Sequence, residues 1–152
     1  PHFAGAATPY MDTNSKAAIL GLTFEHTKTD IYKALMEGTA YEIALNLEIL
    51  KKRGLSAKSV TATGGGARSD VWLQIKADVL GLAVTALDGK EIGGAGTAIM
   101  AGRAVGVYDE NTVLAKPRQT FYPDKKRHTY YKNQLEKYRK IYAAAREVMR
   151  DE

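Results

Sequence analysis

The chain has 152 residues, of which 45% are hydrophobic and 26% charged, and this is typical of one globular domain or a large part of one. The absence of cysteine excludes a disulfide scaffold, a zinc ribbon and a cysteine nucleophile. No apolar run approaches the roughly 20 residues that cross a bilayer. No basic and apolar leader opens the sequence, so we expect a cytoplasmic protein with no membrane partner. Because residues 1–5 include neither a methionine nor a polar lead-in, we also expect a piece of a longer protein.

The first predicted helix follows a loop. Residues 1–26 are rich in Gly, Ala, Thr and Pro and predict irregular structure, with a short strand expected at 18–22. Thr27 and Asp30 then have the spacing of a capping box, in which the Asp30 carboxylate reaches back to the Thr27 N–H. Basic residues precede Gly54, which predicts the helix end. The apolar positions of this helix are Ile31, Leu35, Ile43, Leu47 and Leu50.

Two strands and a second helix are predicted next. Residues 59–63 are a short β-prone run that ends in three glycines, 64–66. Ser69 has the chemistry of an N-cap for a helix that stops at Gly81. Residues 83–87 are the second strand candidate.

A third helix is predicted to open from a glycine-rich turn at 93–96 and to end at Gly106. Its face of small residues predicts close packing against a neighbour. Residues 109–124 are predicted to be a loop. The alternation of helices and strands predicts an α/β architecture of short strands flanked by helices, with right-handed crossovers.

The C-terminal segment is basic. The net charge is +5, and residues 116–150 hold 11 of the 22 basic residues and only three acidic ones. Such a segment can bind nucleic acid or an acidic membrane surface, or it can be the solvated face of a helix. Apolar residues spaced by three and four favour a helix that docks one stripe on the domain, although the stripe could also pair with a second copy. The stripe consists of Tyr131, Leu135, Tyr138, Tyr142, Ala145 and Met149.

The glycine triplet carries the most chemical information. A sharp turn between a strand and a capped helix lets another surface approach the backbone, and the helix directs its free N–H groups to the same place. A nucleotide fits such a site, and so does a plain tight turn. The sequence is neither a P-loop nor a dinucleotide fingerprint, because the Gly-Lys-Ser/Thr and the G-x-G-x-x-G spacings are both missing.

Taken together, four motifs resemble the C-terminal part of the FGGY family of carbohydrate kinases. They span most of the chain and occur in the family's order. The motifs are residues 1–5 with 8–12, residues 21–23 with 30–38, residues 63–69 with Trp72, Gln74 and Asp78, and Glu91 with Gly96, Ala98, Ala101, Gly102 and Gly106.

The resemblance implies an actin-like ATPase (ribonuclease H-like) fold and phosphorylation of a sugar or polyol hydroxyl with ATP and Mg²⁺. Residues 1–152 would then be the C-terminal, nucleotide-side domain, itself incomplete. By the same resemblance, Gly65, Gly66 and Ala67 would pass their backbone against the adenosine, and Asp70 would face the base edge. Since a carboxylate only accepts hydrogen bonds, Asp70 suits the adenine amino group, and a role at the helix start is equally open.

The resemblance places the catalytic Asp and most of the sugar site upstream of Pro1, in an N-terminal domain that is absent here. We therefore assign no catalytic residue and no metal ligand in this chain. We expect Asp12 to serve a turn and Asp78 to be structural. The three histidines lack metal-ligand spacing.

Two alternatives remain open at this stage. One is a nucleic-acid-binding module that uses the basic C-terminal helix, although its tyrosines are expected to be buried rather than free to stack on bases. The other is a non-catalytic actin-like assembly protein. Homo-oligomerisation and the identity of the sugar stay undetermined.

Overall fold

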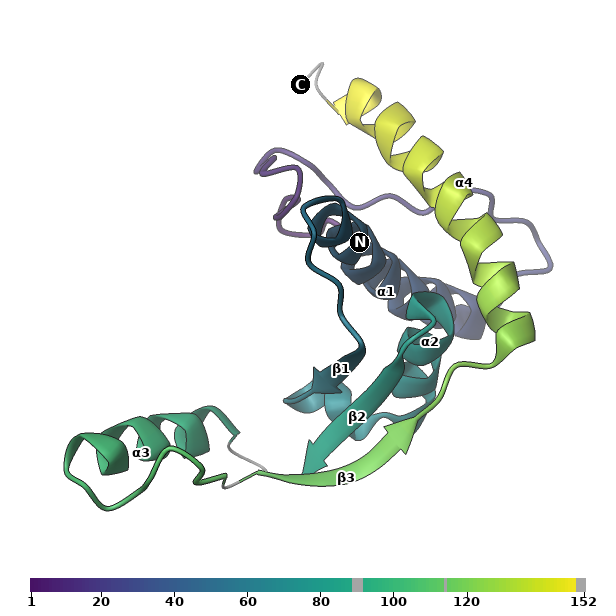
Figure 1. Cartoon of the computed structure of the whole chain (residues 1–152). Helices are drawn as coiled ribbons and strands as arrows, with labels where there is room; N and C mark the ends of the chain where they lie inside the picture. The colour runs from purple at the N-terminus through teal and green to yellow at the C-terminus, as the bar shows by residue number, and fades with distance from the viewer. Residues whose placement is uncertain (89–91, 114, 150–152) are drawn as a thin grey trace.

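The computed structural model describes residues 1–88, 92–113 and 115–149, which form a layered α/β arrangement (Figure 1). A small sheet is covered on one face by α2, and α1 and α4 pack on the other side of α2. This architecture confirms the predicted fold class. The elements are α1 (Lys28–Lys52), β1 (Ser59–Ala62), a 3₁₀ turn (Gly65–Arg68), α2 (Asp70–Leu80), β2 (Ala83–Asp88), α3 (Ile92–Ala104), β3 (Lys116–Phe121) and α4 (Lys125–Met149).

The sheet is mixed, with the order β1-β2-β3. β1 runs parallel to β2, and Val60 lies opposite Val84. β3 runs antiparallel to β2, and its Phe121 also lies opposite Val84. The register of this second pair shifts between Ala86 and Leu87, which marks a β-bulge in β3.

Two apolar clusters hold the layers together. Between the sheet and α2, the buried side chains include Leu73, Val84 and Phe121. Between α2, α1 and α4, they include Tyr41, Ile75 and Leu135. Helix α2 is therefore apolar on two faces, because it is the middle layer.

The capping residues predicted for α1 and α2 form caps in the structure. The Asp30 carboxylate accepts the Thr27 N–H at 2.8 Å and the Thr27 hydroxyl at 2.7 Å, so the capping box forms. At α2, the Ser69 hydroxyl accepts the N–H of Trp72 at 3.3 Å, and Gly81 ends the helix in the left-handed conformation.

The apolar stripe of α4 docks on α1, as predicted. Tyr131, Leu135 and Tyr142 are buried, and the Tyr131 hydroxyl donates to the Glu37 carboxylate at 2.8 Å. The Tyr138 hydroxyl also donates to a carboxylate of α1, that of Glu42. Burial raises the pKa of both of these tyrosines, which keeps their hydroxyl groups protonated as donors.

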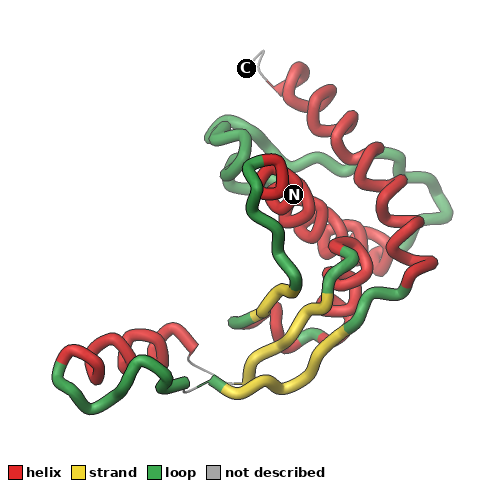
Figure 2. The backbone as a smooth tube through the Cα atoms, viewed as in Figure 1, coloured by secondary structure: helices red, strands yellow, loops and turns green. Residues whose placement is uncertain are grey.

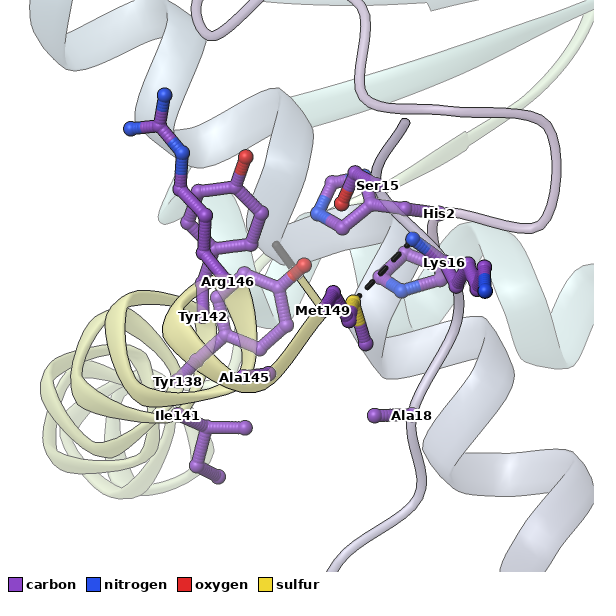
Figure 3. Close-up of a pocket in the computed structure, with 11 residues that line it drawn as sticks. His2, Ser15, Lys16, Ala18, Tyr138, Ile141, Tyr142, Ala145, Arg146 and Met149 are labelled. Atoms are coloured by element: carbon purple, nitrogen blue, oxygen red, sulfur yellow. Dashed lines mark hydrogen bonds between the residues drawn. The ribbon is translucent and has the colours of Figure 1, made fainter. Parts of the chain in front are cut away.

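Figure 2 shows that the segment before α1 is one long loop that passes both α1 and α4. The Asn46 amide donates to the Thr8 carbonyl at 3.1 Å, and the Arg146 guanidinium pairs with Asp12 at 3.2 Å. A cavity of about 30 Å³ remains between this loop and the C-terminal half of α4 (Figure 3). None of the residues that line it belongs to the glycine turn.

Three predictions about elements were wrong. Residues 18–22 form no strand, and β3 occupies part of the segment predicted as loop. The glycines at 93–96 lie inside α3 instead of forming a turn before it. The close packing predicted for the small residues of α3 is found at Gly102, which is buried and where a Cβ would lie 2.2 Å from the Tyr108 ring. The rest of α3 projects beyond the end of β2 (Figure 1). Glu91 lies outside the described residues.

No helix in the described ranges combines the length and apolar character needed to cross a bilayer.

Candidate functional site

The glycine turn lies where the chain leaves the parallel strand β1 and enters α2. Gly64 adopts φ = 76°, a conformation that favours glycine, and the N–H of Ala67 donates to the Gly64 carbonyl at 3.1 Å to close the turn. Gly64 and Gly65 are exposed, and a Cβ built on either would have no heavy atom within 4 Å. One side of the turn is therefore open to a ligand.

The opposite side of the turn rests on the domain. A Cβ on Gly66 would lie 3.0 Å from the ring of Trp72, so this glycine packs tightly against the indole. The Trp72 indole N–H donates to the Met36 carbonyl of α1 at 3.2 Å, and the Lys76 ammonium lies 4.4 Å from the ring centroid. Burial lowers the pKa of Lys76. The turn thus packs on Trp72 at Gly66 and is exposed at Gly64 and Gly65.

Asp70 is the first residue of α2, at the positive end of the helix dipole. Its carboxylate accepts a hydrogen bond from Arg118 of β3 at 2.7 Å. The same Arg118 nitrogen donates to the Ala67 carbonyl at 3.2 Å. One arginine therefore connects β3 to the residue after the glycine turn and to the start of α2.

The structure brings the four predicted site residues together, but they face different ways. Gly65 is on the open side, while Gly66 covers Trp72. The Ala67 side chain is buried in the cluster beneath the sheet, so only its backbone belongs to the turn surface. Asp70 has the helix-start position that the sequence left open, and one of its oxygens is already engaged. No signal near the turn in the sequence pointed to Arg118, because 48 residues separate it from Asp70.

Other acidic side chains have structural roles, as expected. Asp78 is buried, and its Oδ1 accepts from the Gln74 amide and from the Asp124 N–H, both at 2.8 Å. Asp12 accepts the Asn14 N–H at 3.2 Å within its turn. Among the residues that the structure describes, no group of three His, Cys, Asp or Glu side chains converges to hold a metal ion.

Solved structures with the same arrangement give the fold a class. A xylulose kinase from Rhodospirillum rubrum superposes with a TM-score of 0.83 at 25% identity, over 99% of this chain and 30% of that one. A glycerol kinase from Plasmodium falciparum, solved with ADP, superposes with a TM-score of 0.72 at 23% identity, over 90% of this chain and 29% of that one. The fold is that of the actin-like ATPases.

Sequence comparison identifies the family. The model for the FGGY family of carbohydrate kinases, C-terminal domain, matches residues 1–105. A xylulose kinase of Staphylococcus epidermidis is 31% identical over 99% of this chain and 31% of its own length. A glycerol kinase of Enterococcus casseliflavus is 33% identical over 82% of this chain and 25% of its own length. The chain belongs to the FGGY family of carbohydrate kinases.

This chain matches one part of each of these longer relatives. The chain spans about 30% of the length of the xylulose kinases that it matches. The relatives give no support to the nucleic-acid-binding and assembly-protein alternatives.

Proposed function

We propose that this chain is the nucleotide-side domain of a kinase that transfers a phosphoryl group from ATP to a hydroxyl of a sugar or polyol. The observation that carries the proposal is the glycine turn, which is open beside Gly65 and supported by Trp72 beneath Gly66. Backbone without side chains, next to a helix N-terminus, suits the close approach of a nucleoside and its phosphates.

In this proposal, adenosine lies against the open side of residues 64–66. Ala67 contributes backbone only, because its side chain is buried. The free N–H groups at the start of α2 and its dipole favour the negative charge of the nucleotide. The Asp70 carboxylate is 56% exposed and accepts from the adenine amino group.

The remaining parts of the reaction are assigned outside this chain. When bound to the phosphates, Mg²⁺ neutralises charge that develops during transfer. The described residues hold no convergent acidic group for it, so we derive no step through the metal. The catalytic base and most sugar contacts are proposed to lie in an N-terminal domain. The cytoplasmic location remains a prediction.

A panel assay of the whole kinase tests this proposal. The full-length protein would be incubated with ATP and xylulose, glycerol, ribulose or gluconate, with ADP release as the readout. Xylulose and glycerol lead the panel because relatives are named for them. We expect phosphorylation of at least one substrate. Failure with the whole panel, together with no nucleotide binding, would contradict the proposal.

The division of the site between domains gives a second prediction. The 152-residue chain should bind ADP weakly and phosphorylate nothing, because it supplies one wall of the site. Turnover of any sugar by the purified chain would show that the catalytic base has been assigned to the wrong part of the protein.

A further inference from the structure

Arg118 of β3 contacts both the residue that follows the glycine turn and the first residue of α2. Its terminal nitrogen donates to the Ala67 carbonyl and to Asp70 Oδ1, at 3.2 and 2.7 Å. These contacts join β3 to the end of the turn and to the first residue of α2. An arginine in this position limits how the turn and the Asp70 carboxylate can move.

Strand β3 has a bulge at Arg118. In the ladder with β2, Gln119 lies opposite Ala86 and Pro117 lies opposite Leu87, which leaves Arg118 between them without a cross-strand partner. Such bulges redirect a side chain and are frequent beside active sites. Pro117 fits the same edge position because a bulge there needs no ladder N–H from it.

The ion pair leaves a defined acceptor free. Arg118 engages Oδ1 of Asp70, whereas Oδ2 has no hydrogen-bond donor among the described residues. The Asp70 side chain is 56% exposed, so its carboxylate is accessible from solvent. Without Arg118, this carboxylate would rotate in solvent and either oxygen would point in many directions.

We propose that Arg118 is a positioning residue that sets base selectivity. It fixes Asp70 so that Oδ2 accepts a hydrogen bond from the exocyclic amino group of adenine. The inference rests on the proposed function, since it requires the nucleotide to lie on the open side of the turn. A site of this kind favours bases that carry an amino group over purines that lack one.

A purely structural role for Arg118 makes a different prediction. If the arginine only stabilised the junction of β3 with the turn, its removal would lower stability and weaken all nucleotides equally. The ratio of the values measured with the two nucleotides therefore distinguishes the two roles. Because both values come from the same variant, the fraction of folded protein cancels in the ratio.

The experiment compares ATP with purine riboside triphosphate, which lacks only the 6-amino group, in the whole kinase. The variants are Arg118→Ala, Arg118→Lys, Asp70→Ala and the double variant Arg118→Ala/Asp70→Ala. For the parent we expect kcat/KM to favour ATP about tenfold, the lower end for a hydrogen bond to a charged group, because Asp70 is exposed.

Arg118→Ala and Asp70→Ala should each bring the preference close to one through KM, with kcat little changed. The double variant should lose no more of the preference for ATP than either single variant loses. Arg118→Lys should retain part of that preference. An undiminished preference for ATP in Arg118→Ala would overturn the inference while leaving the proposed function intact. A parent enzyme that uses neither nucleotide would overturn both.

Discussion

Neighbouring glycines in the turn serve different purposes. A Cβ on Gly66 would lie 3.0 and 3.3 Å from two ring carbons of Trp72, whereas a Cβ on Gly65 would meet nothing. The indole cannot withdraw freely, because its N–H is bonded to the Met36 carbonyl. Gly66 is thus tightly packed, and the space beside Gly65 is open.

This difference predicts opposite outcomes for two alanine variants. Gly66→Ala should reduce the free energy of unfolding by about 1–3 kcal/mol, the usual range for overpacking. Gly65→Ala should change it by no more than about 0.5 kcal/mol. Urea unfolding of the two variants measures both effects. Equal losses would mean that the turn is packed on both sides.

At the scale of the element, the start of α1 depends on a charged cap. Hydrogen bonds from the Thr27 N–H and hydroxyl lower the pKa of Asp30. The ionised carboxylate therefore stabilises the folded state above the unfolded pKa, near 4, and this contribution disappears as the pH falls through the lower folded pKa.

Asp30→Asn should consequently melt below the parent at pH 7, and the difference should shrink as the pH falls below about 4. Thermal unfolding of both proteins at several pH values measures the difference. The other carboxylates titrate in both proteins, so their contributions cancel in the difference between the two melting temperatures. A gap that stays constant down to pH 2 would rule out the charge as its origin.

Helix α4 is held mainly by its apolar stripe. Leu135 is 7% exposed and packs in the cluster with α1 and α2, whereas Val148 on the same helix is 78% exposed. Leu135→Ala should cost about 2–5 kcal/mol of unfolding free energy. Val148→Ala is the matched control and should cost no more than about 0.5 kcal/mol. Chemical denaturation checks the pair, and similar losses would contradict the docking of this stripe.

Elements with local signals were predictable from the sequence. The Thr27 cap, the Gly81 stop and the α4 stripe each specify their structure within a few residues. β3 was not predictable, because its charged residues and Pro117 lack strand character and only pairing with β2 makes it a strand. Conversely, residues 18–22 are mostly apolar but form no strand.

For the whole molecule, the sequence located the glycine turn but not its surroundings. The turn follows a strand and precedes a cap, so its position could be inferred from neighbours in the chain. The contact of Arg118 with Asp70 depends on how β3 folds back across 48 residues. Trp72 was noted in a motif, but its position under Gly66 depends on α1, which receives its indole N–H.

The arrangement of the layers suits the proposed role of this chain as one wall of a nucleotide site. Helix α2 is fixed on one face by the sheet and on the other by α1 and α4. Its N-terminus and the preceding turn are therefore held rigidly, while Gly64 and Gly65 stay exposed. A binding surface requires rigid support from the packed elements and a backbone that a ligand can reach.

The most direct test of this account is nucleotide binding to Gly65→Leu, read by the fluorescence of Trp72, the only tryptophan of the chain. The structure has room for a side chain at position 65, so the fold should persist, whereas the leucine would occupy the space assigned to adenosine. We expect ADP to change the fluorescence of the parent chain, and Gly65→Leu to weaken binding at least about tenfold with circular dichroism unchanged. Binding of ADP to Gly65→Leu with the affinity of the parent would show that the nucleotide does not lie on the open side of the glycine turn.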